Sequence, residues 1–377
     1  MSPTKHDAVL MIGASERDAN LRYATRFLAP DPFVYVALRG KTYLLMNDLE
    51  FGRAKTQANV DEVLAISVLE KRLKERGKKA AFPDLVDLFF RGKRVKTILV
   101  PGYFNFAYAE ALREKGYRLI AKEEPFFKER LFKTKEEIAN IAETLRATEA
   151  AMEAGIQTIV RSRISNGKLY ADGEALTSER VKQTIHLELL KHDCAAEHTI
   201  VACGNDAVDP HNEGAGPLRA EEPIVIDLFP RSRRHGYVAD ITRTVVKGKA
   251  KPKVKRMYRA VKEAQEIAFH LLKDGAEGSS VHCRILRYFD KQGFRTGHRK
   301  GKMQGFFHGT GHGVGLEVHE PPRISSVKEV IRARQVVTVE PALYYLDAGG
   351  VRIEDLVVVT KTGIQNLTRF PKQLEIP

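Results

Sequence analysis

Four carboxylates stand in segments whose other residues are typical of buried β-strands. They are Asp227, Asp240, Glu340 and Glu354. Carboxylates are among the residues least often buried without a partner. Burying an isolated one costs several kcal/mol or forces it to take up a proton. Four acids in apolar strands therefore need a common explanation.

The spacing of the acids suggests that explanation. Asp227 and Asp240 are 13 residues apart, Glu340 and Glu354 are 14 apart, and each pair brackets a turn-rich loop. Each pair fits a hairpin with one carboxylate on each strand and both on the same face. Four acids on one face repel one another, and multivalent cations remove that repulsion. A salt bridge to Lys or Arg would explain any one acid, but it does not explain all four.

A glycine-rich segment adds three imidazoles to this set. His308, His312 and His319 lie within 12 positions that also hold four glycines. No GxGxxG pattern occurs there and no Lys-Ser/Thr follows, which excludes a phosphate-binding loop. No cysteine is near, so a soft-metal zinc site is disfavoured. Carboxylates with an imidazole suit Mn²⁺, Co²⁺ or Fe²⁺, and a pair of ions roughly 3.5 Å apart commonly uses so many carboxylates.

The residues before about 132 predict a small α/β domain. We expect strands at 33–38, 42–46, 97–100 and 117–120, and helices at 63–75 and in a stretch that ends at Lys115. This alternation is typical of strands covered by helices. No cluster of catalytic residue types occurs in the segment. We therefore interpret residues 1–132 as a scaffold or substrate-shaping domain.

Residues 133–377 predict a second domain with a repeated plan. Thr134 and Glu137 have the spacing of a capping box at the start of a long amphipathic helix. The predicted elements are helices at 134–159, 178–191, 254–273 and 280–292, and strands at 223–229, 239–246, 335–340 and 351–359. The order helix, helix, strand, strand thus occurs twice, which favours internal duplication without requiring it.

Composition excludes several classes of protein. The chain has 377 residues, 43% of them hydrophobic and 29% charged, so disorder is excluded as its main state. No apolar run approaches the ~18–20 residues of a membrane span. The first residues lack the apolar region of a secretory signal. Three cysteines, Cys194, Cys203 and Cys283, are too few and too scattered for a disulfide framework. We expect a reduced, cytoplasmic protein.

The formal net charge of +14 raises nucleic acid as a partner. The basic runs at 71–79 and 247–259 carry no nucleic-acid-binding motif, so we interpret them as solvated faces. The loop at 231–235 is different, because it joins two of the candidate ligands and could shape substrate choice. We expect no nucleic acid partner and no membrane partner.

The motifs around these acids resemble those of the pita-bread metallopeptidases, namely methionine aminopeptidase, aminopeptidase P and prolidase. The matching motifs are VIDLF, ADITRT, HGTGH, TVEPALY and RIED, and they occur in the family's order. The match covers residues 133–377, and residues 1–132 resemble the smaller N-terminal domain of the prolidase and aminopeptidase P branch. The resemblance implies an α+β fold with duplicated halves in the second domain and a smaller α/β domain before it.

By this resemblance, five residues bind two divalent ions. They are Asp227, Asp240, His312, Glu340 and Glu354. Asp240 and Glu354 would be candidates to bridge the ions, with His312 and Glu340 on one ion and Asp227 on the other. Mn²⁺ is the first expectation, and Co²⁺, Fe²⁺ or Zn²⁺ are alternatives. The internal duplication of the family accounts for the repeated plan.

The resemblance also assigns roles around the metals. Glu340, His211 and His319 would be catalytic, with Glu340 as the general base. His308, Arg323, Tyr344 and Arg352 would contact substrate. An arginine such as Arg323 is a natural partner for a free C-terminal carboxylate, which favours dipeptides. The implied activity is hydrolysis of Xaa-Pro bonds by an Xaa-Pro dipeptidase that forms a homodimer.

Two alternatives stay open at this point. An Xaa-Pro aminopeptidase would act on longer peptides, and a non-enzymatic pita-bread protein would bind partners through its basic surface. Phe229 stands where many relatives have glycine, and so does Ala342. These departures leave the ligand set intact but affect the expected substrate range.

Overall fold

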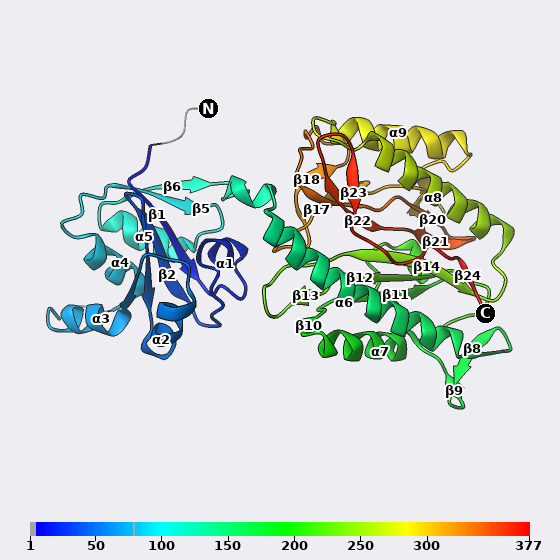
Figure 1. Cartoon of the computed structure of the whole chain (residues 1–377), viewed down its shortest axis with the longest axis horizontal. Coiled ribbons are helices and arrows are strands. Elements are labelled where there is room, and N and C mark those ends of the chain that lie inside the picture. The colour runs from blue at the N-terminus through cyan, green and yellow to red at the C-terminus, as the bar shows by residue number, and fades with distance from the viewer. Residues whose placement is uncertain (1–4, 78–79) are drawn as a thin grey trace. The chain divides into compact units, whose positions relative to one another are not determined.

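A computed structural model describes residues 5–77 and 80–377 (Figure 1). The chain divides into two compact units, Met1–Arg130 and Leu131–Pro377. The sequence-based boundary between 132 and 133 stays a prediction. The first four residues, and positions 78 and 79 of the basic run 71–79, lie outside the described residues. Within the described ranges, no helix is both long and apolar enough to cross a bilayer.

The first unit is one six-stranded sheet with helices on both faces. Its strands follow the order β4-β3-β2-β1-β5-β6 across the sheet. The strands are β1 (Ala8–Gly13), β2 (Phe33–Leu38), β3 (Lys41–Met46), β4 (Glu62–Ala65), β5 (Thr97–Pro101) and β6 (Arg118–Lys122). The helices are α1 (Ala19–Thr25), α2 (Asp48–Gln57), α3 (Ile66–Lys74), α4 (Phe82–Phe90) and α5 (Phe106–Glu114), followed by a 3-10 turn at Lys128–Leu131.

Strand β2 shows why both faces of this sheet are covered. All six of its residues are apolar, and successive side chains of a strand point to opposite faces. Val34 and Val36 pack in a core with residues of α3 and α4. Phe33 and Tyr35 pack in a second core with residues of α1 and α2. The α/β character predicted for this part of the chain follows from these two cores.

One predicted helix in this unit is wrong at its start. The spacing of apolar residues predicts a helix from Val63, but Glu62–Ala65 forms strand β4, parallel to β3. Helix α3 begins only at Ile66. So short an apolar run is compatible with both the helical and the strand periodicity. These residues form a strand because they pair with the edge of β3.

The second unit has four long helices and two larger sheets that together carry half of its strands. The helices are α6 (Lys135–Val160), α7 (Ser178–Lys191), α8 (Pro252–Leu271) and α9 (Gly278–Lys291), with a 3-10 turn at Asp206–Val208. The two sheets have the orders β11-β12-β14-β24 and β18-β17-β19-β22-β23. Their strands are β11 (Thr199–Cys203), β12 (Ile224–Leu228), β14 (Ile241–Lys247), β24 (Glu375–Ile376), β17 (Gly311–Gly313), β18 (Glu320–Ile324), β19 (Val336–Val339), β22 (Asp355–Val359) and β23 (Ile364–Asn366).

Smaller strands complete the second unit. They form a hairpin, a three-stranded sheet and two further two-stranded pairs. These strands are β20 (Ala342–Tyr345), β21 (Gly349–Arg352), β7 (Arg163–Ser165), β8 (Lys168–Ala171), β9 (Glu174–Ala175), β10 (Cys194–Ala195), β13 (Arg231–Ser232), β15 (Gly297–Arg299) and β16 (Lys302–Gln304).

The order of elements in this unit confirms the predicted repetition. Helices α6 and α7 precede β11, β12 and β14, and helices α8 and α9 precede β17, β19 and β22. In Figure 1 the strands lie between the α6/α7 pair and the α8/α9 pair. The capping box is present, because the Thr134 hydroxyl accepts from the Glu137 amide and the Glu137 carboxylate accepts from the Thr134 amide.

The strand predicted over 351–359 is wrong, because it is two strands. β21 ends at Arg352 and β22 begins at Asp355. The hairpin partner is broken at the same level, between β19 and β20, where Pro341 has no N–H to donate to a ladder. The break places Glu340 and Glu354 outside the regular ladder, with their backbones free to bond elsewhere.

Gln265 on α8 closes this gap. Its side chain is fully buried, and its amide nitrogen donates to the carbonyls of Val339 (2.8 Å) and Ile353 (3.3 Å). These two residues directly precede Glu340 and Glu354 in the chain. The carboxamide therefore replaces hydrogen bonds that the interrupted ladder cannot make.

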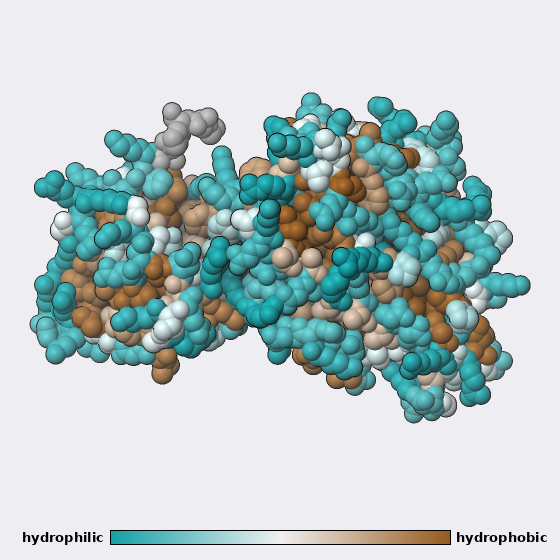
Figure 2. Space-filling model, in the orientation of Figure 1, coloured by the Kyte–Doolittle hydropathy of each residue, from teal (hydrophilic) through white to brown (hydrophobic). Residues whose placement is uncertain are grey.

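From the sequence, we interpret the basic runs at 71–79 and 247–259 as solvated faces, and the structure agrees with this only in part. Hydrophilic residues cover most of the face seen in Figure 2. Lys247 is an exception, since it is buried and donates to the carbonyl of Val160 at 2.6 Å. All three cysteines are free thiols, with Cys194 and Cys203 buried and Cys283 exposed.

We predict that Gln265→Leu lowers the free energy of unfolding by about 2 kcal/mol, because two buried carbonyls lose their donor. Gln157→Leu is the matched control. Gln157 lies on α6 and donates only to Glu153, a neighbour on the same helix, so its loss should cost less than about 0.5 kcal/mol. Urea denaturation measures both variants. Equal losses of unfolding free energy in the two variants would show that the hydrogen bonds from Gln265 to Val339 and Ile353 do not stabilise the fold.

Candidate metal centre

Four carboxylates and one imidazole line a single cavity in the second unit. They come from the ends of five strand segments that are distant in sequence. The residues are Asp227 in β12, Asp240 just before β14, His312 in β17, Glu340 just after β19 and Glu354 between β21 and β22. All five positions predicted to bind metal are therefore brought together.

The first acid pair is set by the register of two antiparallel strands. Asp227 on β12 lies directly opposite Thr242 on β14. Asp240 precedes Thr242 by two residues, so its side chain is on the same face as those of Thr242 and Asp227. The predicted antiparallel pairing of the two segments is thus confirmed, but Asp240 stands one residue before β14, and the acids are diagonal to each other.

The second pair follows from the broken hairpin. β19 pairs with β22 and β20 pairs with β21 in one continuous antiparallel register. That register places Glu340 opposite Glu354 at the break. The Glu340 amide donates to the carbonyl of Thr310 (2.8 Å), and the Glu354 amide donates to that of Thr242 (3.1 Å). The second bond joins the two halves of the unit at the acids.

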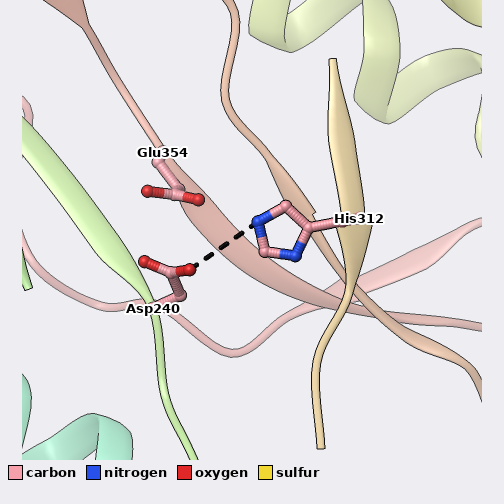
Figure 3. Close-up of side chains that lie close together, drawn as sticks. All are labelled: Asp240, His312 and Glu354. Carbon is pink, nitrogen blue, oxygen red and sulfur yellow. Dashed lines mark ion pairs between the residues drawn. The ribbon is translucent and has the colours of Figure 1, made fainter. Parts of the chain in front are cut away.

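The imidazole of His312 presents one nitrogen to the acids. Its Nδ1 donates to the Gly313 carbonyl at 3.2 Å, which leaves the Nε2 lone pair free. Nε2 lies 3.4 Å from Glu340 Oε1 and 3.8 Å from Asp240 Oδ2. Figure 3 shows the ring directed between Asp240 and Glu354. This tautomer is the one that binds a metal through Nε2.

The donor set fits divalent cations. One ligand atom each from Asp240, His312 and Glu354 lie within 4.8 Å of one another. Among the described residues, the buried Asp227 Oδ1 has no hydrogen-bond partner. Carboxylate oxygens with one imidazole are suitable ligands for hard or borderline ions. An open carboxylate oxygen beside three convergent donors is what a cation would satisfy.

The electrostatics of the cluster also favour a cation. Burial, and then the neighbouring carboxylates, raise the pKa of Asp240 and of Glu354 well above the usual range. Burial raises the pKa of Glu340 to about 7. Burial lowers the pKa of His312 to about 3, so its imidazole is neutral. A bound cation would favour the charged form of all these carboxylates.

Two threonines that sequence reasoning missed hold the carboxylates. Thr242 Oγ1 donates to Glu354 Oε2 at 2.6 Å. Thr338 Oγ1 lies 3.4 Å from Glu340 Oε1 and accepts from the His312 amide at 3.0 Å. Each threonine is two residues from an acid on the same strand segment. Because residues two apart in a strand share a face, this spacing is a signal in the sequence that could have identified them.

Arg352 lines the cavity beside the acids, and Tyr344 lies behind it. Arg352 Nη2 contacts Asp227 Oδ2 at 2.6 Å, and its Nη1 donates to the Tyr344 hydroxyl at 2.8 Å. Tyr344 has no exposed surface and is not among the residues that line the cavity. In this geometry Tyr344 supports Arg352 and His308 (3.0 Å to Nε2), and does not itself reach the cavity.

The other candidate residues do line the cavity. It has a volume of about 950 Å³ and is bounded by His211, His308, His319 and Arg323 in addition to the acids. The rings of His312 and His319 meet edge to face, with centroids 4.4 Å apart. Burial lowers the pKa of His308 to about 3. The sequence-predicted substrate residues other than Tyr344 are therefore at one cavity.

The departures noted in the sequence fall in different places. Phe229 lines the cavity next to the acids, whereas Ala342 is buried in β20. The loop at 231–235 does not line the cavity. Within that loop, Arg231 donates to the carbonyls of Gly236 (2.8 Å) and Leu316. Phe229 is thus the departure that can alter substrate range directly.

Comparison with known proteins places this centre in a family. The model of metallopeptidase family M24 matches residues 139–361, which is more than half of the chain. The chain belongs to metallopeptidase family M24. Among curated members, the Xaa-Pro dipeptidase of Pyrococcus furiosus is 30% identical over 292 residues, covering 75% of this chain and 76% of the relative. That of Pyrococcus horikoshii is 28% identical over 346 residues, covering 90% and 88%.

Solved structures of M24 proteins share the fold over the whole chain. The prolidase from Pyrococcus furiosus superimposes with a TM-score of 0.77 at 26% identity, covering 97% of each chain. The X-Pro aminopeptidase from Thermotoga maritima gives 0.81 at 24% identity, covering 99% of this chain and 98% of that one. The second likeness shows the fold alone. The pita-bread fold expected from the motifs is confirmed, and the chain is a metallopeptidase.

The raised carboxylate pKa values predict how the stability of this M24 chain depends on pH in excess chelator. A carboxyl whose pKa is higher in the folded state holds its proton more tightly when folded. For Glu340, whose ordinary pKa is 4.5, the stability gained below that value is lost as pH rises through about 7. Asp240 and Glu354 act in the same direction.

The test compares the wild type with Glu340→Gln by thermal unfolding at several pH values between 4.5 and 7.5 in chelator. As the pH is raised from 4.5 to 7.5, the Tm of the variant minus the Tm of the wild type should increase by several degrees. When saturating Mn²⁺ replaces the chelator, the wild-type Tm should rise most at the upper end of this pH range. A Tm difference that does not change with pH would contradict the assigned direction.

Proposed function

We propose that this chain is an Xaa-Pro dipeptidase that uses two divalent cations. The observation that carries the proposal is the convergence of four carboxylates and the His312 imidazole on one cavity that also presents Arg323. The Pyrococcus relatives named Xaa-Pro dipeptidase support the same activity. The substrates would be proline-containing dipeptides or short peptides, and nucleic acid is not a proposed partner.

The five donors would hold both ions. These donors would be Asp227, Asp240, His312, Glu340 and Glu354, with the ligand atoms of Asp240, His312 and Glu354 already within 4.8 Å of one another. Mn²⁺ is the metal proposed first, with Co²⁺, Fe²⁺ or Zn²⁺ as substitutes. When bound, such ions polarise a carbonyl and lower the pKa of a water molecule.

Glu340 is the proposed general base. Its side chain is 16% exposed, whereas those of Asp227 and Asp240 are 11% and 5% exposed, and Glu354 as a whole residue is 2% exposed. It is thus the most exposed of the four clustered carboxylates. Its Oε atoms would accept the proton of the attacking water and return it to the leaving nitrogen.

The histidines that line the cavity would bind and orient the substrate. His319 would donate to the oxygen that becomes negative in the tetrahedral transition state. His211 would assist in orientation and proton transfer. His308, whose burial keeps it neutral, would pack against the proline ring. Arg352, which lines the cavity, would contact the substrate and hold Asp227, and Tyr344 would hold His308 and Arg352 in place from behind.

Arg323 would select dipeptides by binding the free carboxylate of the proline residue. It is exposed on β18, opposite His312 of β17, so its guanidinium can approach the same cavity. A guanidinium binds a carboxylate with two parallel hydrogen bonds. A longer peptide has an amide at this position and would lose that interaction.

An Xaa-Pro aminopeptidase is the second candidate. The cavity volume of about 950 Å³ exceeds what a dipeptide fills, and the fold matches that of the Thermotoga maritima X-Pro aminopeptidase. Size alone therefore does not select dipeptides. Discrimination would depend on Arg323.

We predict that Glu340→Gln lowers kcat by at least about 10²-fold, because the amide cannot accept the proton. Hydrolysis of an Xaa-Pro dipeptide with Mn²⁺ measures it. Glu266→Gln is the control, since Glu266 is an exposed glutamate on α8 and its substitution should leave kcat unchanged. A Glu340→Gln variant with activity close to wild type would exclude Glu340 as the base.

We predict that the wild type prefers Xaa-Pro over Xaa-Pro-NH₂ and Xaa-Pro-Gly. Arg323→Met should raise KM for Xaa-Pro by about tenfold to a hundredfold, the value of a charged hydrogen bond, and should not change KM for Xaa-Pro-NH₂. Arg299→Met, at an exposed site on β15, is the control. Faster cleavage of Xaa-Pro-Gly than of Xaa-Pro would favour the aminopeptidase.

The same panel, run with Mn²⁺, Co²⁺, Fe²⁺, Zn²⁺ and chelator, would identify the preferred metal. A homodimer in the cytoplasm completes the proposal. For a chain of 42.4 kDa, the dimer would give about twice that mass by light scattering.

A further inference from the structure

A buried ion pair lies behind the loop that carries His319. Lys133 Nζ is 2.9 Å from Glu320 Oε2, and the two side chains are only 2% and 3% exposed. Lys133 directly precedes the capping residue of α6, and Glu320 directly follows His319. The pair therefore connects the start of the longest helix to the edge of the cavity.

Glu320 also organises the loop between β17 and β18. Its Oε1 accepts from the amides of Leu316 (3.1 Å) and Glu317 (3.2 Å), so one carboxylate binds two loop amides and Lys133. Gly315 makes this possible, since a Cβ there would lie 2.6 Å from Glu320 Oε2. The loop thus folds around the carboxylate.

Other contacts leave the loop little freedom. The Val314 amide donates to the Val336 carbonyl at 3.0 Å, and the Gly315 carbonyl accepts from the Val238 amide at 2.9 Å. Arg231 donates to the Leu316 carbonyl. This contact gives the basic loop a role in supporting the cavity wall, although it does not line the cavity.

Lys133 is itself fixed by its backbone. Its amide donates to the Arg334 carbonyl at 2.8 Å, and its carbonyl accepts from Arg334 Nε at 3.2 Å. A buried ion pair gives little net stability, because desolvation offsets the attraction. Its effect is instead geometric, since a fixed ammonium group admits only one position of the carboxylate that orders the loop.

His319 is exposed at the end of this loop, and its ring meets that of His312 edge to face at 4.4 Å. We propose that the Lys133–Glu320 ion pair is a positioning element that fixes the His319 imidazole beside His312. This inference rests on the proposed function, in which His319 stabilises the transition state. The pair touches neither substrate nor the acids and acts only through the loop.

The test uses Lys133→Met, Glu320→Gln and the double variant. Lys133→Met removes the ammonium group that binds Glu320 Oε2, and kcat should fall by about tenfold to a hundredfold while KM stays within about threefold. In the double variant the glutamine oxygen can still accept from the two loop amides, and both members of the Lys133–Glu320 pair are neutral. It should recover part of the lost kcat.

Lys253→Met is the matched control, because Lys253 forms an exposed ion pair with Asp347 and should leave kcat unchanged. If Lys133→Met does not fold, the double variant carries the test, and its kcat should remain below that of the wild type. Wild-type kcat in a folded Lys133→Met or in the double variant would overturn the inference.

A readout independent of turnover separates this inference from the proposed function. In protein labelled with ¹³C-histidine, the His319 resonance, assigned with His319→Gln, should shift in Lys133→Met and move back toward its wild-type position in the double variant. Mn²⁺ content should stay unchanged. An unmoved resonance would overturn the inference even if the wild type cleaves Xaa-Pro. A shifted resonance in a protein inactive on every peptide would instead reject the proposed function.

Discussion

Four carboxylates are buried within one small volume, and the rest of the second unit is arranged around that constraint. Mutual repulsion and lost hydration both oppose it. Thr242 contributes a hydroxyl to Glu354, and Arg352 contributes a guanidinium to Asp227. These contacts satisfy some carboxylate oxygens, while Asp227 Oδ1 stays open among the described residues. Cations complete such a cluster, so the affinity for metal and the geometry of the fold are coupled.

The duplicated architecture delivers the acids in pairs. Each half supplies two from neighbouring antiparallel segments, and the halves are joined where the Glu354 amide binds the Thr242 carbonyl. Arg243, fully buried, reinforces that join by donating to the carbonyls of Thr242 (2.9 Å) and Glu354 (2.7 Å). Only the second half carries the glycine-rich segment with its histidines. The pseudo-symmetry therefore builds the cluster of acids, and the departure from it supplies three of the histidines that line the cavity, His308, His312 and His319.

Local patterns in the sequence were sufficient to predict most helices and strands. Where they failed, the failure has a physical reason. The helix at 178–191 has the predicted bounds, because its apolar spacing and its threonine cap agree. The run from Val63 satisfies both periods, and the neighbouring strand decides its first residues. The run at 351–359 looks continuous, but Pro341 and the bond from Glu354 to Thr242 interrupt it. Both errors occur where a contact distant in sequence competes with local preference.

The sequence by itself determined which residues form the cluster, because buried acids without local partners are costly and their motifs occur in the order of the M24 family. It did not determine what holds them. Gln265 spans the broken hairpin and Lys133 reaches Glu320, and neither residue belongs to a motif. Tyr344, read from its motif as a substrate contact, is buried behind Arg352. These contacts depend on which elements pack together in the folded chain. A hydrogen bond forms between groups that are close in space, and the spacing of residues in the sequence does not show which distant groups will meet.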